Sequence, residues 1–384
     1  MKICLINNLY KPYIRGGAEM VMETIHNGLS NMGHDVFVIS TAPKFKTENK
    51  AYRLKSQYYN LGKMPLFFRL FWHFYDMFDF FTAQKAIKII HEEKPDLVIT
   101  NNLKGISFLL PFFIKKSRIQ HIHIIHDAQL LHPSGLMMHG KEKEFDSLPN
   151  KFYIKISKYL FSFCGSVVSP SQWLLDLHLK YGFFNKIQKT VIPNPVNIIK
   201  PAFIKTKTKT NHRLIQFLYV GQIEKYKGVE FLVNSFVGHN DIGLTIVGDG
   251  SFLNRLKQIA KDSTNIIFTG RKSREEVSEL MQDADCLIVP SLCYENSPTV
   301  IYEAMAANLP VLGSRIGGIT EFLDDIGGML FEPGDKKDLL EKIDLIIKNP
   351  QKIEDLKKNY TNVIDKYTLQ NYLNQLLKNL ANSN

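Results

Sequence analysis

The 384-residue sequence has few cysteines, and it lacks the patterns that mark secreted, membrane-spanning and zinc-binding proteins. Its four cysteines, at positions 4, 164, 286 and 293, form no CxxC or zinc-type spacing. We therefore expect reduced thiols and a cytoplasmic protein, with Cys4, Cys164 and Cys286 as small core residues in apolar stretches. After Lys2 the apolar run is only ICLI, so we expect no signal peptide. No stretch of roughly 20 apolar residues predicts a transmembrane helix.

Two further absences limit the reactions and metal sites that we expect. No GxGxxG pattern follows a predicted strand, which counts against a nicotinamide-dependent oxidoreductase. Asp283 and Asp285 resemble a DxD metal motif, but they stand before the apolar run CLIVPS and are better interpreted as a helix-to-strand turn. His121 and His123 alternate with isoleucine and match no zinc spacing, so we interpret them as structural. We accordingly expect no metal site and no cofactor.

The positive charge lies in one half of the chain. Residues 1–197 contain 25 Lys and Arg against 14 Asp and Glu, a net charge of +11, whereas residues 198–384 contain 23 of each and balance. Such an asymmetry indicates an anionic partner for the first half. No nucleic-acid-binding module is present, so an anionic membrane surface is the preferred partner, which predicts a peripheral location on the inner face of the plasma membrane.

Apolar strand-like runs alternate with helical patterns through two series. The expected strands lie at 2–8, 35–41, 96–102, 119–127, 166–171 and 189–196, then at 215–221, 244–250, 265–270, 285–291 and 309–314. This alternation predicts an α/β protein with two Rossmann-like, doubly wound parallel-sheet domains, whose strands' carboxyl ends face one cleft. We expect domains at 1–197 and 213–365, a lysine-rich linker at 198–212, and a final helix at 366–384.

The segment 291–321 is the most informative part of the chain. Ser297 is expected to cap a short helix whose first residue is Pro298, and Asn308 with Pro310 should end it. The start of a helix binds anions through its unpaired N–H groups and its dipole. Glu303 lies five residues beyond Pro298, roughly 7–8 Å along the axis. A diphosphate at the helix start, with its ribose at Glu303 and a sugar near Glu295, would suit this spacing.

Three other sites follow predicted strands. Gly16 and Gly17 open the first helix and allow a phosphate or sugar to approach the backbone, although a plain tight turn is an equal interpretation. Lys227 opens a helix after the strand ending at Gly221 and could neutralise a diphosphate; the alternative is a solvated surface lysine. His126 could hydrogen-bond a sugar hydroxyl, with Asp127 fixing its orientation.

Residues 66–81 are exceptionally aromatic, with nine aromatic side chains in fifteen residues from Phe67. The polar residues Arg69, His73, Asp76 and Asp79 fall on one narrow helical stripe. Two hypotheses remain open. The segment is either a helix buried on most faces or a surface that enters a bilayer or grips a lipid acceptor.

Taken in order, these motifs resemble those of the retaining glycosyltransferases of family 4, which have the two-domain GT-B fold. The resemblance spans most of the chain. It rests on GGAE at 16–19, HD at 126–127, SPSQWL at 169–174, IPNPV at 192–196, GQIEKYKG at 221–228, VGDG at 247–250, the segment 268–291, and the pair Glu295 and Glu303 with seven residues between them.

The resemblance implies sugar transfer from a UDP- or GDP-hexose, with retention at the anomeric carbon and without a metal. It implies that the second domain holds the donor and that the first holds a saccharide or lipid-linked acceptor, in bacterial surface-polysaccharide synthesis. The catalytic residues would be His126, Lys227 and Glu295. The substrate-binding residues would be Gly16, Gly17, Gln222, Asn296, Ser297, Thr299 and Glu303. Gln222 replaces a frequent arginine of the family, and Asn308 replaces a frequent glycine.

Other functions remain open. A nucleotide-sugar epimerase or a phosphorylase of the same fold would use the same donor-binding motifs. A catalytically silent subunit that only binds a sugar nucleotide is a further alternative, and Gln222 is the motif change that suggests it.

Overall fold

The computed structural model describes residues 1–13, 16–43, 46–48, 50–195 and 214–381. The chain divides into two compact units, each built around one sheet. The first contains Met1–Leu136, Lys143–Pro195 and Leu369–Asn384, and the second contains Met137–Glu142 and Val196–Thr368. The linker expected at 198–212 lies outside the described residues. The domain boundaries and the cleft inferred from the sequence stay predictions.

An eight-stranded sheet forms the first unit, in the order β3-β4-β2-β1-β5-β6-β7-β8. All neighbouring strands are parallel except β3 and β4. Most strand residues are apolar and buried, as expected of a parallel sheet covered on both faces. The strands are β1 Lys2–Ile6, β2 Asp35–Ala42, β3 Lys46–Glu48, β4 Ala51–Lys55, β5 Leu97–Thr100, β6 Gln120–Ile124, β7 Ser166–Ser169 and β8 Gln188–Val191.

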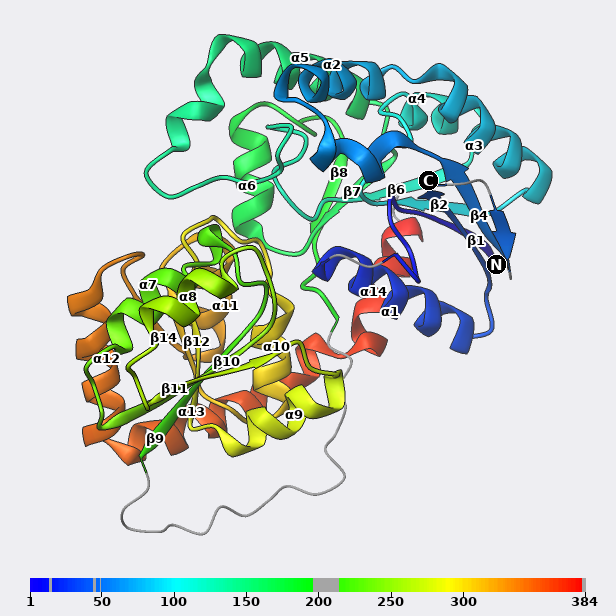
Figure 1. The fold of residues 1–384 in the computed structure, drawn as a ribbon. Helices are drawn as coiled ribbons and strands as arrows, with labels where there is room; N and C mark the ends of the chain where they lie inside the picture. The colour runs from blue at the N-terminus through cyan, green and yellow to red at the C-terminus, as the bar shows by residue number, and fades with distance from the viewer. Residues whose placement is uncertain (14–15, 44–45, 49, 196–213, 382–384) are drawn as a thin grey trace. The chain divides into compact units, whose positions relative to one another are not determined.

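Helices cover both faces of this sheet (Figure 1). Ile3 and Leu5 of β1 share one core with Met22 and Ile25 of α1 and with Leu373 of α14. Helices α2 to α5 lie over the opposite face (Figure 1). The helices are α1 Gly17–Asn31, α2 Leu66–Met77, α3 Phe80–Glu93, α4 Leu110–Lys116, α5 Leu148–Phe161, α6 Gln172–Lys180 and α14 Leu369–Ala381.

A six-stranded parallel sheet forms the second unit, in the order β11-β10-β9-β12-β13-β14. Its strands are β9 Ile215–Val220, β10 Ile242–Val247, β11 Ile266–Gly270, β12 Cys286–Val289, β13 Val311–Ser314 and β14 Met329–Phe331. Its helices are α7 Val229–Phe236, α8 Leu253–Ile259, α9 Arg274–Asp283, α10 Thr299–Ala306, α11 Gly317–Ile326, α12 Lys336–Lys348 and α13 Pro350–Val363. The 3-10 helices are η1 Gln57–Lys63, η2 Glu142–Asp146, η3 Lys225–Lys227 and η4 Ile364–Tyr367. The two sheets confirm the doubly wound α/β architecture inferred from the sequence.

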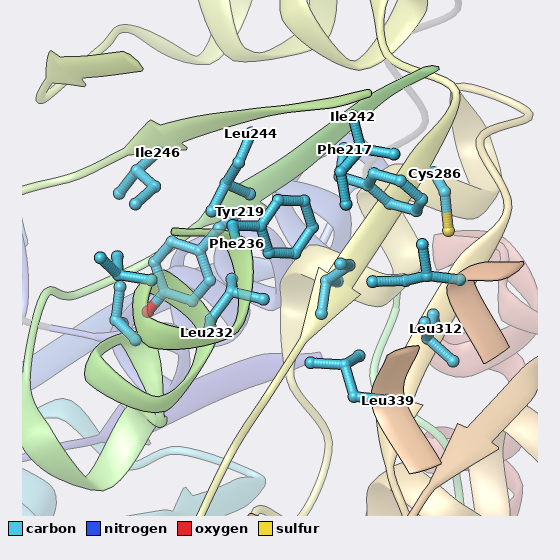
Figure 2. Close-up of a cluster of buried hydrophobic side chains, with 14 of the residues drawn as sticks. Phe217, Tyr219, Leu232, Phe236, Ile242, Leu244, Ile246, Cys286, Leu312 and Leu339 are labelled. Carbon is cyan, nitrogen blue, oxygen red and sulfur yellow. The ribbon is translucent and has the colours of Figure 1, made fainter. Parts of the chain in front are cut away.

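The side chains of β9 point alternately to the two faces of the sheet, and so they enter two separate cores of the second unit. Phe217 and Tyr219 enter the core that α7, α8 and α12 cover, and Figure 2 shows them with Phe236 and Leu339. Leu218 points to the other face, where α9, α10, α11 and α13 pack. The strand ends of this sheet are therefore fixed by buried side chains on both faces.

All four cysteines are free and buried, and Cys4, Cys164 and Cys286 are the core residues expected from the sequence. Among the described residues, no helix is both long and apolar enough to cross a bilayer.

Candidate functional site

In the second unit, the candidate site is formed by the loops that follow four adjacent strands. β10, β9, β12 and β13 are neighbours in the sheet, so their following loops emerge at one edge. The loops are tied together through the backbone. Ile223 N donates to Asp249 O at 2.9 Å, and Leu292 N donates to Tyr226 O at 3.0 Å. This network positions the loops that carry Lys227 and Glu295.

Lys227 and Glu295 form a direct ion pair. Nζ of Lys227 lies 2.8 Å from Oε2 of Glu295, and both side chains are partly buried. Burial lowers the pKa of the Lys227 ammonium group, but the negative charge of Glu295 and their hydrogen bond, together with Cys293 and Tyr226, raise it by more, so the net pKa is raised. The structure therefore brings together two residues that are 68 positions apart in the chain.

Helix α10 begins one residue later than the sequence indicated. Pro298 is the N-cap and Thr299 the first helical residue, and Pro298 offers no side-chain hydrogen bond. Ser297 was expected to be the cap, and that expectation is wrong. Its hydroxyl lies 2.5 Å from the hydroxyl of Tyr302 and is used there. Asn308 has φ 56°, the left-handed conformation expected at the helix end.

Glu303 lies four residues into α10, on its exposed side. The surrounding protein atoms raise the pKa of its carboxyl group, and the positive charge of Arg274 partly offsets this effect. Arg274 is the first residue of α9 and was not identified from the sequence. Its proximity to Glu303 depends on the pairing of α9 and α10 with the sheet, which no local motif encodes.

Two glycines allow the loops to approach closely. A Cβ on Gly228 would lie 1.8 Å from the carbonyl oxygen of Pro290, and Gly228 has φ 72°. A Cβ on Gly318 would lie 1.6 Å from the carbonyl oxygen of Asn296, and Gly318 N donates to Glu295 O at 2.8 Å. The start of α11 thus fixes the loop of Glu295 and the buried Asn296. This role of Gly318 was not predicted from the sequence.

A segment from the first half of the chain also packs on the site loop. Met138 forms an antiparallel bridge with Cys293, and Tyr294 N donates to Met137 O at 2.8 Å. The Tyr294 hydroxyl donates to Glu142 Oε1 at 2.9 Å. Residues Met137–Glu142 therefore count in the second unit by their contacts. They stabilise the loop immediately before Glu295.

Gln222 lies on the exposed side of the loop after β9. Its side-chain oxygen accepts a hydrogen bond from the Tyr226 hydroxyl at 2.7 Å, and its carbonyl accepts one from the Tyr219 hydroxyl at 2.7 Å. Tyr226 in turn places its ring 5.7 Å from Nζ of Lys227. Gln222 is therefore part of the structure that surrounds Lys227, although it carries no charge of its own.

His126 lies in the first unit, just beyond the end of β6. Its Nε2 is 2.8 Å from Oδ1 of Asn101, and because an amide oxygen can only accept, Nε2 donates. Burial lowers the pKa of His126 to about 4, so the ring is neutral at pH 7. Oδ1 of Asp127 accepts from the backbone of Gln129 at 2.7 Å. Asn101, which the sequence analysis did not consider, is thus an orienting partner of His126.

Gly16 and Gly17 stand at the exposed start of α1, where Gly16 is the N-cap. Gly16 N donates to Glu19 Oε2 at 2.6 Å. Its φ of −156° is open to any residue, and among the described residues a Cβ there would first meet Glu19 Oε2, at 3.6 Å. The described contacts around position 16 therefore do not require glycine there.

Hydrogen bonds and helix ends show the structural roles that we expected for two histidines and two aspartates: His121, His123, Asp283 and Asp285. The Thr100 hydroxyl lies 2.8 Å from Nε2 of His121 and 2.9 Å from Nδ1 of His123, and both rings are buried. Asp283 ends α9, and Oδ2 of Asp285 accepts from Gln216 N at 2.9 Å, which confirms the helix-to-strand turn. Within the described residues, no group of three His, Cys, Asp or Glu side chains could hold a metal ion.

Comparison with known families accounts for nearly the entire chain. A model described as Glycosyltransferase Family 4 matches residues 15–200, and one described as Glycosyl transferases group 1 matches residues 202–363. An uncharacterized 42.6 kDa protein in the cps region of Klebsiella pneumoniae is 31% identical over 392 residues, covering 97% of this chain and 99% of that protein. The lipopolysaccharide 1,2-N-acetylglucosaminetransferase of Salmonella typhimurium is 30% identical over 43% of this chain and 48% of its own length.

A solved structure shows the fold. The crystal structure of Anabaena HepE in complex with UDP superimposes with a TM-score of 0.75 over 100% of both chains, at 18% sequence identity. The similarity extends through both sheets, which establishes the GT-B fold for this chain.

Proposed function

The chain belongs to the group 1 glycosyltransferases of family 4, and we propose that it moves a hexose from a UDP- or GDP-linked donor to a saccharide or lipid-linked acceptor. The observation that carries this proposal is the Lys227–Glu295 ion pair, with α10 and Glu303 following in the same loop-and-helix segment. The relative from a cps region and the lipopolysaccharide transferase of Salmonella typhimurium support a role in surface-polysaccharide synthesis.

Lys227 and the start of α10 are suited to bind the diphosphate of the donor. An ammonium group and a helix N-terminus both favour negative charge. Lys227 remains protonated at neutral pH because its pKa is raised. In the proposed complex, a phosphate oxygen takes over part of the interaction that Lys227 makes with Glu295, and the amides at Thr299 face the second phosphate.

Most of the remaining donor contacts come from the segment that contains Glu295 and α10. A carboxylate accepts two hydroxyl donors, so Glu303 suits the two hydroxyl groups of a ribose. Glu295 would then accept from a hydroxyl group of the sugar. Gln222, Asn296 and Ser297 would complete the donor contacts, with Gln222 in the place where the family often has an arginine.

The reaction retains the configuration of the anomeric carbon. The bond between this carbon and the phosphate oxygen breaks, and the departing diphosphate keeps the electron pair. The acceptor hydroxyl attacks from the same face, and its proton passes to a leaving phosphate oxygen. Positive charge builds on the sugar and negative charge on the phosphate, so the fixed charge of Lys227 stabilises the transition state more than the bound donor.

We assign the acceptor to the first unit, together with His126, Gly16 and Gly17. The neutral ring of His126 can exchange a hydrogen bond with a substrate hydroxyl without adding a charge. Gly16 and Gly17 are exposed at the start of α1, where the backbone could meet a phosphate or sugar. The excess positive charge of residues 1–197 suits an acceptor that carries phosphate, as a lipid-linked saccharide does.

Transfer from labelled donors tests the proposal. Purified protein is incubated with UDP- and GDP-hexoses and with lipid-linked saccharide acceptors, and the anomeric configuration of the product is measured by NMR. We expect one donor and acceptor pair to give a retained glycoside. Lys227→Ala should lower kcat about 100-fold, and Glu303→Ala should weaken donor binding about tenfold or more. Lys257→Ala, at an exposed position of α8, is the matched control.

Three results contradict the proposal. Donor turnover without any acceptor, giving an isomerised sugar, indicates an epimerase. Donor binding without turnover under all conditions indicates a silent binding subunit. Wild-type rates in both Lys227→Ala and Glu303→Ala remove the assigned site.

A further inference from the structure

Helix α2 has its polar side inward and its aromatic side outward. Asp76 is only 4% exposed, and both its carboxylate oxygens accept from Gly105 N, at 2.8 and 2.9 Å. Arg69 and His73 lie on the same side and are partly buried. Phe67 is 76% exposed and Phe71 is 66% exposed on the opposite side. The idea that this helix is buried on most faces is therefore wrong.

The exposed rings continue across the neighbouring helices. We call the aromatic face the exposed set Phe67, Phe68, Phe71, Phe74, Tyr75, Phe78, Phe81, Phe112, Phe152 and Tyr159, from α2 to α5 and the α2–α3 turn. Ring centroids of Phe74 and Phe152 are 6.1 Å apart, which joins α2 to α5. Phe163 contacts both Phe112, at 5.1 Å, and Tyr159, at 5.4 Å, which joins α4 to α5. Figure 1 shows α2 to α5 on one side of the first unit.

Lysines lie beside the rings of α4 and α5, and acidic groups are few. Nζ of Lys115 lies 5.7 Å from the centroid of Phe163, and Nζ of Lys116 lies 6.0 Å from that of Phe112. Helix α5 adds exposed Lys151, Lys155 and Lys158, and α4 and α5 contain no acidic residue. The single acidic residue of α2 is the buried Asp76. Cations beside aromatic rings match the phosphates and acyl chains of a bilayer interface.

A basic pocket opens beside the aromatic face. It has a volume of about 770 Å³, and its lining includes Lys115, Arg118, Lys158, Lys186 and Phe163. Lys115 and Phe163 belong to the ring contacts described above, so the pocket continues the same surface. Four cations around one cavity of this size suit a phosphate-bearing headgroup.

We propose that the aromatic face docks the first unit on a membrane that contains anionic phospholipids. The rings enter the bilayer interface, and the surrounding lysines and the basic pocket contact lipid phosphates. Helix α2 has 12 residues, which makes it about 18 Å long, too short to cross a hydrocarbon core of about 30 Å. It therefore lies along the surface. This surface goes beyond glycosyl transfer and does not depend on it.

Charge complementarity selects a membrane over a second copy of the chain. A self-complementary interface would place the lysines of one copy against those of the other or against its rings. An anionic bilayer instead supplies both an apolar layer and a dense negative layer. The net charge of +11 within residues 1–197 also favours an anionic bilayer over a second, equally basic copy of the chain.

Vesicle flotation without donor or acceptor tests the docking surface. The full chain should float with phosphatidylcholine vesicles that contain phosphatidylglycerol, and bind pure phosphatidylcholine weakly. The triple variant Phe67→Ser, Phe71→Ser and Phe81→Ser should lower the partition coefficient about tenfold or more. Lys151→Glu with Lys155→Glu should lower it about tenfold or more, for anionic vesicles only. These side chains are exposed, so the variants should fold, which circular dichroism checks.

Ile267→Ser with Val237→Ser, at exposed apolar positions of the second unit, is the matched control and should float like the wild type. A folded triple variant that floats like the wild type overturns the proposal. So does a wild-type chain that binds no anionic vesicle. A stable dimer in light scattering, dissociated by the triple variant, would assign the face to a second copy and also overturn it. Activity is not measured, so failure here is independent of the proposed reaction.

Discussion

The charge of Lys227 reflects two opposing effects. Burial is the largest single effect and lowers the pKa of the ammonium group, but the carboxylate of Glu295, 2.8 Å away, together with Cys293 and Tyr226, raises the pKa by more in sum. A lysine kept charged in this way is ready to interact with a second anion. Glu295 therefore has a role beyond any contact with a sugar, because it holds Lys227 protonated and oriented.

Glu295→Gln tests this balance directly. Removing the carboxylate leaves burial as the larger effect, so the pKa of Lys227 should fall below its value in the wild type. NMR titration of the Lys227 side chain measures the change. The control Glu341→Gln alters an exposed pair with Lys337, 3.9 Å apart, and should leave the pKa of Lys227 unchanged. An unchanged pKa in Glu295→Gln would show that Glu295 does not stabilise the ammonium group.

Helix α11 and the loop after β12 are joined by a contact between backbones. Gly318 N donates to Glu295 O, and no space remains for a side chain at position 318. The helix start thus acts as a support for the loop that carries Glu295 and Asn296. Its effect on the site is indirect, because neither Gly317 nor Gly318 has a side chain to contact a ligand.

Gly318→Ala should displace the loop and lower the free energy of unfolding by about 1–3 kcal/mol. The added Cβ would lie 1.6 Å from Asn296 O, so either the loop or the helix must move. Chemical denaturation measures the stability, and donor affinity should fall in the same variant. Gly16→Ala is the contrast: among the described residues its Cβ would first meet Glu19 Oε2, at 3.6 Å, so its stability should stay near that of the wild type. Equal stability of the two variants would contradict the close approach.

The apolar strands β9 to β13 of the second unit could be predicted, because burial on both faces of a parallel sheet leaves continuous apolar runs. Helix α11 was not predicted. β3, β4 and β14 were missed, since strands of only three to five residues give a weak pattern, and β3 and β4 also contain polar residues. The cap of α10 was wrong by one residue because the Ser297 hydroxyl bonds to Tyr302 instead of to the backbone. The inverted orientation of α2 could not be predicted, since a stripe pattern does not tell which side faces the protein.

Glu295, Lys227 and Glu303 could be named as candidates because strand-to-loop transitions and a short helix mark them in the sequence. The residues that contact the candidate site residues could not be predicted from the sequence. Asn101 beside His126, Arg274 near Glu303 and the segment Met137–Glu142 beside Tyr294 come from distant parts of the chain. Such contacts depend on strand order, which local pattern does not determine.

The two units carry different chemistry. The second has the ion pair, α10 and Glu303, and its half of the chain is electrically balanced. Residues 1–197, which supply most of the first unit, carry the net charge of +11, and the first unit also holds the partly buried His126 and the aromatic face. This division suits an enzyme that takes a water-soluble donor on one unit and meets an amphipathic acceptor on the other.

A crystal structure of the chain with bound UDP or GDP tests the proposed function most directly. We predict the diphosphate within hydrogen-bonding distance of Lys227 Nζ and of the amides at the start of α10, with the ribose hydroxyls on Glu303. A nucleotide bound to the first unit, or one in the second unit with its phosphates directed away from Lys227 and Thr299, would contradict it.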